Sequence, residues 1–154
     1  MRAAVLTIST TRARGEGEDV SGRALVELCE AAGLDTTHAV VPDDREQIAG
    51  ELRRLADEEG VRFVFTTGGT GLTQDDVTPE ATRDAIDREA PGFAETIRAE
   101  SRAHTPLGIL TRGVSGVRGR TLIVNFPGSP NGVRQSWPVV EPTLRHAAAT
   151  LERD

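Results

Sequence analysis

The chain of 154 residues contains no lysine, so all 18 of its basic residues are arginines. The absence of lysine excludes Schiff-base catalysis and the lysine-dependent loop that binds nucleoside triphosphates in P-loop enzymes. Cysteine is almost as scarce: Cys29 stands alone, so the chain cannot form an internal disulfide bond. Because Cys29 lies on an apolar helical face, we interpret it as a packing residue. Since the chain has no internal disulfide bond, we expect a cytoplasmic protein.

Long apolar runs and an excess of positive charge are also missing. No apolar run approaches the roughly 20 residues that a membrane-spanning helix needs, so we expect no membrane association. The net charge of −6 and the isoelectric point of about 5.1 argue against non-specific binding of nucleic acid. The three histidines lie far apart and lack the spacing of metal ligands: His38, His104 and His146.

The pattern of apolar residues predicts a single α/β domain over residues 1–154. Short apolar runs alternate with segments of helical periodicity, which predicts three layers: a mostly parallel sheet with helices on both faces. The expected strands are residues 2–9, 37–41, 61–67, 107–112 and 121–126. The expected helices are residues 22–33, 43–60, 78–89, 93–103, 133–137 and 138–151. A loop is expected at residues 10–21 and a turn at residues 114–119.

The stretch from residue 63 to residue 80 has the most informative order of residue types. An apolar strand leads into a loop with three glycines in four residues, 68–71, and then into an acidic turn with Asp75 and Asp76. A helix then begins at Thr78 and Pro79. Glycines let the main chain approach a bulky anion, and their N–H groups can point at phosphate oxygens. Two carboxylates beside a phosphate would repel it unless a divalent cation lay between them, so the order indicates nucleotide and magnesium chemistry.

Each of these features also has a purely structural interpretation. The glycine cluster is neither G-x-G-x-x-G nor a Walker loop and could be a simple turn, although its place after a buried strand favours phosphate binding. Asp43 could cap a helix with Glu46 as its partner, and Asp76 could merely order the turn that precedes the next helix. Alternatively, Asp43 and Asp76 bind magnesium from opposite sides of one crevice, where the loops that follow the parallel strands converge.

Several segments together resemble the MogA/MoaB family of molybdenum cofactor biosynthesis, which is related to the gephyrin-type domain. The similar segments follow in the family's order and spacing: residues 9–22, 66–71, 76–81, 91–93 and 127–130. The resemblance covers nearly the whole chain. It implies a molybdopterin-binding α/β fold, a homotrimer, and adenylylation of molybdopterin by ATP with release of pyrophosphate. It also implies a handover of the product to a molybdenum insertase.

The resemblance also implies roles for particular residues. Asp43 and Asp76 match the two carboxylates that the family uses with Mg²⁺ in catalysis. The residues that match the family's nucleotide and pterin site are Ser9, Thr67, Gly68, Gly69, Thr70, Gly71, Thr78, Pro79, Glu80, Gly128, Ser129 and Asn131. Many relatives carry a basic residue where this chain has Asp75, and lysine where it has Asn131. These two departures favour an alternative function, in which the protein binds or delivers molybdopterin without catalysis.

Overall fold

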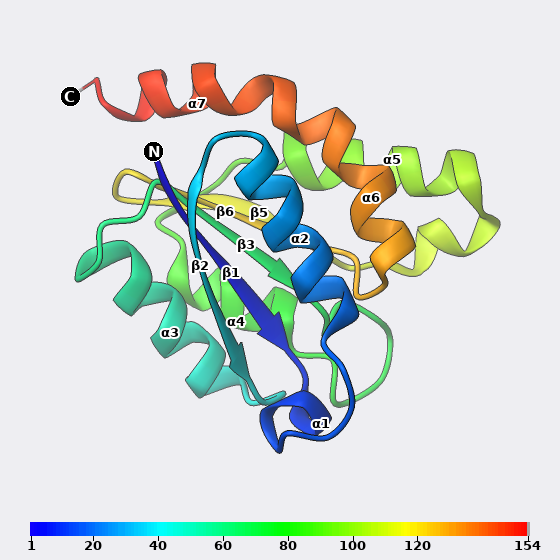
Figure 1. Ribbon diagram of the computed structural model, residues 1–154. Coiled ribbons are helices and arrows are strands. Elements are labelled where there is room, and N and C mark those ends of the chain that lie inside the picture. Colours follow the sequence, from blue (N-terminus) through cyan, green and yellow to red (C-terminus); the bar gives the residue numbers. More distant parts are fainter. Residues whose placement is uncertain (154) are drawn as a thin grey trace.

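The computed structural model describes residues 1–153 and has three layers, with helices on both faces of one six-stranded sheet (Figure 1). The strand order is β2-β1-β3-β6-β5-β4. The first four strands of this order are parallel, and β5 and β4 add an antiparallel edge. The strands are β1 (Arg2–Ile8), β2 (Asp35–Val41), β3 (Phe63–Thr67), β4 (Arg88–Glu89), β5 (Ser115–Arg118) and β6 (Thr121–Phe126). The predicted fold class is confirmed.

The helices divide between the two faces of the sheet. One face packs against α2 (Val20–Ala31), α5 (Gly92–His104), α6 (Pro130–Val140) and α7 (Leu144–Leu151). The other face packs against α3 (Arg45–Asp57) and α4 (Thr78–Ala85). The short helix α1 (Thr10–Ala13) lies beyond the carboxyl end of β1 (Figure 1). Two 3₁₀ turns complete the chain, η1 (Pro106–Leu110) and η2 (Glu141–Thr143).

The two-residue period of the strands builds both halves of the core. In β1, Val5 faces the α2 side and Leu6 faces the α3 side, because successive side chains of a strand point to opposite faces. On the α2 side the ring of Phe65 packs edge-on against the rings of Phe126 and Trp137, with centroids 5.6 and 5.5 Å apart. These perpendicular contacts fix the position of α6, which carries Trp137, against the centre of the sheet.

Cys29 is a packing residue, as the sequence predicts. Its side chain is fully buried in the core between α2 and the sheet. Burial raises the pKa of the Cys29 thiol to about 12, so the thiol stays protonated and unreactive at neutral pH.

Five expectations about the secondary structure were wrong. The helix expected at 78–89 ends at Ala85, because Asp87 N donates to Val117 O and draws the chain into the sheet as β4. The segment expected as a turn at 114–119 is its partner strand β5. The strand expected at 107–112 is the 3₁₀ turn η1, at whose start Thr105 Oγ1 accepts a hydrogen bond from Leu107 N. The loop expected at 10–21 contains α1, which Ser9 caps by accepting a hydrogen bond from Arg12 N.

The helix boundary expected at Pro138 is also absent from the described residues. α6 continues through Pro138 to Val140, and η2 separates it from α7. Proline lacks the N–H that would bond back to the preceding turn, but Pro138 lies on the exposed side of the helix, where water can satisfy the freed carbonyl.

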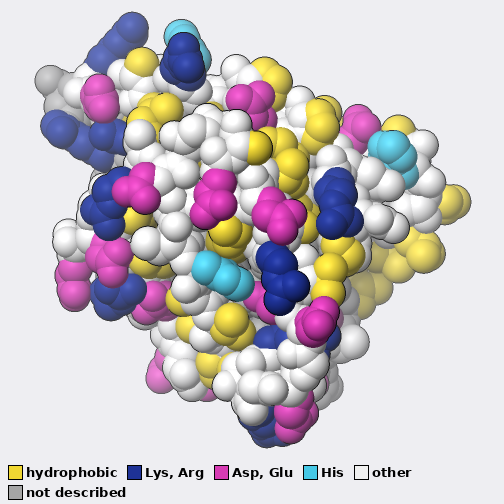
Figure 2. Space-filling model, viewed as in Figure 1, with side chains coloured by type: hydrophobic (Ala, Val, Ile, Leu, Met, Phe, Trp, Pro, Cys, Tyr) yellow, Lys and Arg dark blue, Asp and Glu magenta, His cyan; other side chains and the backbone are white. Residues whose placement is uncertain are grey.

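The surface carries charges of both signs. On the face drawn in Figure 2, acidic and basic side chains are interspersed, and neither sign gathers into one large patch. Within residues 1–153, no helix combines the length and the apolar character that crossing a membrane requires.

Candidate functional site

A crevice opens where the order of the strands reverses. From β1 the chain passes to β2 on one side and then to β3 on the other. The loops that leave β1 and β3 therefore lead to helices on opposite faces of the sheet, α2 and α4, and a crevice opens between them. The resulting cavity has a volume of about 490 Å³ and lies at the carboxyl ends of these strands. Its walls are Thr7, Ile8, Ser9, Arg12, Glu18, Asp19, Val20, Ser21, Thr67, Gly68, Gly69, Gly128 and Pro130. The loops after β1, β3 and β6 therefore border one cavity, as the sequence predicts. The loop after β2 was also expected there, but among residues 1–153 the cavity walls include none of its residues, and they include neither Asp43 nor Asp76.

The glycine loop after β3 is tightly closed against the start of α4. Gly68 and Gly69 both have positive φ, which turns the main chain sharply at the floor of the crevice. Thr78 holds this turn from behind, because its Oγ1 donates to Gly68 O at 2.9 Å and its N–H donates to Gly69 O at 3.1 Å. Within the described residues, the N–H groups of Gly69, Thr70 and Gly71 make no hydrogen bond, so these three donors are available to an anion.

Asp43 links the loop after β2 to the loop after β1. Its Oδ2 accepts hydrogen bonds from Thr10 N and Thr10 Oγ1 at 3.0 and 3.1 Å, and Thr10 Oγ1 in turn accepts from Asp43 N. The cap of α3 is the next residue, Asp44, whose Oδ1 accepts from Gln47 N. The interpretation of Asp43 as a helix cap is therefore wrong.

Asp76 orders the turn between the glycine loop and α4. Its Oδ2 accepts from Thr73 N at 3.0 Å and from Thr73 Oγ1 at 2.8 Å. This contact confirms that Asp76 orders the turn. It leaves Oδ1 of Asp76, like Oδ1 of Asp43, without a hydrogen-bond partner among the described residues.

The donor chemistry of these two aspartates fits Mg²⁺. Within residues 1–153, no group of three His, Cys, Asp or Glu side chains is placed to hold a metal ion on its own. Mg²⁺ is usually bound by one or two carboxylates together with substrate phosphates, rather than by a complete protein cage. Asp43 lies two residues after the end of β2 and Asp76 nine residues after the end of β3, so both belong to connections that leave the carboxyl edge of the sheet. One free carboxylate oxygen on each aspartate suits an ion that also binds phosphate.

The structure places the predicted binding residues in three groups. Five of them line the crevice: Ser9, Thr67, Gly68, Gly69 and Gly128. Ser129 and Asn131 line a side cavity of about 360 Å³, whose other walls are Ser101, His104, Thr105, Leu107, Gly108, Thr111, Pro127, Gly132 and Gln135. The remaining five line neither cavity within the described chain and build the loop instead: Thr70, Gly71, Thr78, Pro79 and Glu80.

The crevice and the side cavity lie on the two sides of one turn, which runs from β6 into α6. Thr67 Oγ1 donates to Pro127 O at 2.6 Å and so ties this turn to the glycine loop. Ser129 Oγ accepts from Gly132 N at 3.0 Å and caps α6. The turn therefore forms a fixed wall between the two cavities.

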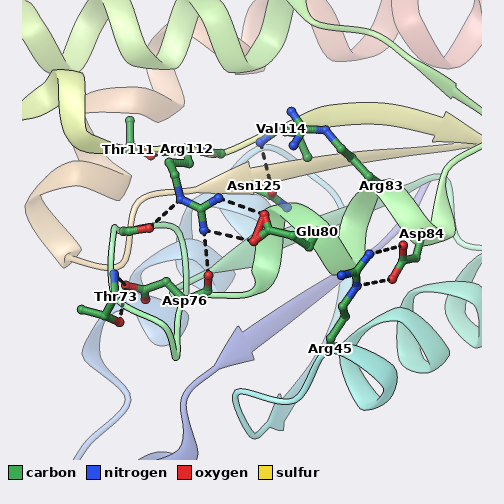
Figure 3. Close-up of polar contacts among 12 residues, drawn as sticks. Arg45, Thr73, Asp76, Glu80, Arg83, Asp84, Thr111, Arg112, Val114 and Asn125 are labelled. Atoms are coloured by element: carbon green, nitrogen blue, oxygen red, sulfur yellow. Dashed lines mark hydrogen bonds and ion pairs between the residues drawn. The ribbon is translucent and has the colours of Figure 1, made fainter.

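Glu80 faces an arginine rather than open space. Its two carboxylate oxygens accept from Arg112 Nη1 and Nη2 at 2.9 and 3.1 Å (Figure 3). These hydrogen bonds lower the pKa of Glu80 below its ordinary value of 4.5 and outweigh the opposing effect of burial. Glu80 is therefore ionised at neutral pH and already paired.

Asp19 and Arg12 are among the crevice residues that the sequence did not assign to the site. Asp19 Oδ2 accepts from Thr7 Oγ1 at 2.6 Å and lies 2.9 Å from His38 Nε2, while Asp19 Oδ1 caps α2. Arg12 contributes the positive charge of the crevice wall. Both belong to the segment 9–22, and the signal that could have found Asp19 is its spacing of three residues before Gly22, which is typical of a helix cap.

The family comparison agrees with this geometry. The family model described as "Probable molybdopterin binding domain" matches residues 4–146. The Molybdopterin adenylyltransferase of Helicobacter pylori strain J99 is 36% identical over 143 residues, which are 91% of this chain and 81% of that protein. The Molybdenum cofactor synthesis protein cinnamon of Drosophila melanogaster is 39% identical over 97% of this chain, but the chain spans only 25% of that protein.

Solved structures are similar over the full length of the fold. The molybdopterin biosynthesis enzyme MoaB from Thermus thermophilus superposes with a TM-score of 0.91 at 44% identity. The superposition covers 99% of this chain and 97% of that protein. The similarity therefore extends over nearly the whole of both chains.

Proposed function

This chain belongs to the family of molybdopterin-binding domains, and from this membership we propose that it catalyses the Mg²⁺- and ATP-dependent adenylylation of molybdopterin in molybdenum cofactor biosynthesis. The products are adenylylated molybdopterin and pyrophosphate. The observation that carries the proposal is the glycine loop after β3, where the N–H groups of three successive residues have no partner among the described residues and the first of them, Gly69, lines the crevice.

The residues of the crevice account for the binding of two anions in one place. The unpaired N–H groups of Gly69, Thr70 and Gly71 provide fixed dipoles for the phosphates of ATP, and they need no reorganisation when negative charge develops. Arg12 adds a positive charge at the wall. Holding both substrates in line is the larger part of catalysis in phosphoryl and nucleotidyl transfer, because the protein has little covalent chemistry to perform.

In the proposed reaction, an oxygen of the terminal phosphate of molybdopterin attacks the α-phosphorus of ATP. The new P–O bond forms as the bond between the α-phosphorus and the bridging oxygen of pyrophosphate breaks. The attacking phosphate is already ionised at neutral pH, so no side chain has to act as a general base. Asp43 and Asp76 would hold Mg²⁺ through their free Oδ1 atoms, and the ion would neutralise phosphate charge.

The side cavity is the proposed place for the pterin. Its polar walls offer hydrogen-bond donors and acceptors of the kind that a heterocycle requires, among them Thr105, Asn131 and Gln135. It adjoins the crevice across the turn that contains Gly128 and Ser129. A molybdopterin bound there could direct its phosphate over this turn towards the glycine loop.

Pyrophosphate release tests the proposal directly. The protein is incubated with ATP, Mg²⁺ and molybdopterin, and pyrophosphate and adenylylated molybdopterin are measured together. We expect the two products in equal amounts, and we expect neither when molybdopterin is omitted or when EDTA removes the metal. Failure to form either product under these conditions would refute the enzymatic proposal.

A non-catalytic carrier of molybdopterin is the second candidate. The crevice walls carry one arginine and two acidic side chains, Glu18 and Asp19, and the adjoining segments contain Asp75 and Asn131. Acidic side chains therefore outnumber basic ones at the crevice wall, which favours a site that binds one anion rather than two. Calorimetry separates the candidates, because a carrier would bind molybdopterin but would not bind ATP with or without Mg²⁺.

The proposal includes a homotrimer in the cytoplasm that passes its product to a molybdenum insertase. Three apolar side chains on η1 are exposed, Leu107, Ile109 and Leu110, and they supply apolar surface of the kind that subunit contacts bury. Sedimentation equilibrium should give a mass about three times that of the 16.5 kDa chain. The mass of a monomer at micromolar concentration would contradict the trimer.

A further inference from the structure

Arg112 makes an unusual number of contacts with the segment that follows the glycine loop. It lies in the connection between η1 and β5, and its main-chain N–H donates to Thr70 O at 2.8 Å. Its guanidinium donates from Nε to Gly71 O at 2.8 Å and from Nη2 to Asp76 O at 2.7 Å. The same guanidinium forms the bidentate ion pair with Glu80. Figure 3 shows it lying between Glu80 on α4 and the loop.

These contacts hold the loop at both of its ends. The exposed loop runs from Gly71, the last glycine, to Asp76, the last residue of the acidic turn, and α4 begins two residues later at Thr78. The ion pair with Glu80 sets the guanidinium relative to the first turn of α4. Arg112 therefore cross-links the start of the loop, the end of the loop and the following helix through one side chain.

The loop has little else to fix it. Residues 72–75 are exposed, so the loop gains no support from the core. The hydrogen bonds within it join only Thr73 and Asp76: Asp76 N donates to Thr73 O, and Asp76 Oδ2 accepts from Thr73. These bonds shape the turn but do not attach it to the rest of the protein. The attachment is supplied by Arg112.

We propose that Arg112 is a positioning residue for nucleotidyl transfer: it fixes residues 71–76 so that the Asp76 carboxylate and the glycine N–H groups face the phosphates of ATP together. This inference rests on the function proposed above. Arg112 need not touch either substrate, because its guanidinium donors are already directed at Gly71, Asp76 and Glu80. It acts through the loop.

The geometry requires a guanidinium and not simply a positive charge. The planar group of arginine presents its N–H donors in a fixed fork, which here reaches two carbonyl oxygens and a carboxylate at once. The ammonium of lysine is a single point with three donors and cannot span the same acceptors. Arg112→Lys therefore keeps the charge but removes the simultaneous hydrogen bonds to the loop and to α4.

The chain contains a matched control in Arg118. Its guanidinium also forms a bidentate ion pair, in which Nε and Nη2 donate to the two carboxylate oxygens of Asp57 at 2.9 and 2.7 Å. Its Nη1 also donates to a main-chain oxygen, Ala85 O, at 2.8 Å. Arg118 lies at the end of β5 that pairs with the start of β6, so it is at the end of the sheet opposite the crevice. Arg118→Lys should cause a similar loss of stability without affecting the loop.

The first measurement does not depend on catalysis. Amide hydrogen exchange at Thr73 and Asp76, whose N–H groups are the hydrogen-bonded ones of this loop segment, is compared in the wild-type protein, Arg112→Lys, Glu80→Gln and Arg118→Lys. We expect at least tenfold faster exchange in this segment for Arg112→Lys and Glu80→Gln, and wild-type exchange for Arg118→Lys. Unchanged exchange in Arg112→Lys would overturn the positioning role, whether or not the protein proves to be an adenylyltransferase.

The second measurement separates positioning from general stability. For Arg112→Lys we expect kcat for pyrophosphate release to fall about 10- to 100-fold and KM for ATP to rise, with KM for molybdopterin unchanged. The double variant Arg112→Lys, Glu80→Gln should lose less activity than the product of the two single losses, because both substitutions break the same ion pair. Equal losses of kcat in Arg112→Lys and Arg118→Lys would show a role in stability alone. Absence of pyrophosphate release in the wild-type protein would instead refute the proposed function, and the exchange data would still decide the role of Arg112.

Discussion

Asp76→Asn should lower kcat for pyrophosphate release about 100-fold or more without unfolding the loop that carries it. The amide oxygen of asparagine can still accept from Thr73 N and Thr73 Oγ1, so the turn keeps its internal hydrogen bonds. The substitution removes the negative charge and with it one oxygen ligand for Mg²⁺. We therefore expect the concentration of Mg²⁺ required for half-maximal rate to rise as kcat falls.

Asp75→Asn is the control for this experiment. Asp75 is the adjacent carboxylate, it is exposed, and it forms no hydrogen bond or ion pair with the described residues. Removing its charge alters the net charge of the protein by the same amount as Asp76→Asn, and we expect kcat to change less than about twofold. If Asp76→Asn keeps the wild-type rate at every Mg²⁺ concentration, Asp76 does not bind the metal that the reaction needs.

The layers of the fold could be predicted from the sequence because they depend on local periodicity. The apolar runs of β1, β3 and β6 are buried on both faces, and the amphipathic helices α2 and α3 repeat their apolar residues at helical spacing. The antiparallel edge could not be predicted in this way. β4 has two residues and pairs with β5, which is distant in the sequence; β5 has four residues and pairs with β6 across only residues 119 and 120, so both strands are too short to show a clear period of their own.

The composition of the site shows the same limit. Gly68 and Gly69 could be assigned to the crevice because a glycine loop after a buried strand has a known place in parallel sheets. Arg112 could not be assigned, because it lies 32 residues from Glu80 and its surroundings of Pro106, Gly108 and Gly113 indicate only a loop. Glu80 matched a binding motif, but its partner is revealed only by the folded structure.

Thr78 illustrates how one residue can serve the site from behind. The sequence predicts it as the start of a helix and, by family resemblance, as part of the binding site. The structure buries it completely and directs its hydroxyl at Gly68 O. Its hydrogen bonds hold the carbonyl oxygens of Gly68 and Gly69, while the N–H group of Gly69, which lines the crevice, has no partner among the described residues. The predicted importance of Thr78 is thus consistent with a supporting contact rather than with ligand binding.

Gly68→Ala should be the most destabilising single substitution in the glycine loop. Gly68 has a φ of +101°, a conformation that side chains of L-residues rarely adopt. A Cβ at this position would lie well under 3.0 Å from the carbonyl oxygen of Ile8. That oxygen belongs to the last residue of β1 at the centre of the sheet, so it cannot move aside as the end of a flexible side chain could. We expect the free energy of unfolding to fall by roughly 3 kcal/mol or more, combining backbone strain with overpacking.

Gly33→Ala separates the two causes, because Gly33 shares the backbone conformation without the close contact. Its φ is +83°, and no atom lies within 4 Å of the Cβ that alanine would add. We expect this control to lose only the cost of the left-handed conformation, about 1 to 2 kcal/mol in urea denaturation. The excess loss in Gly68→Ala then measures how closely β1 and the glycine loop approach at the crevice floor. That approach also fixes the neighbouring N–H groups, so Gly68→Ala should bind ATP at least tenfold more weakly at temperatures where it remains folded, whereas Gly33→Ala should bind it normally. Equal losses of stability in the two variants, with normal ATP binding in both, would mean that the crevice floor tolerates displacement and that the N–H groups at Gly69 to Gly71 are not the anion site.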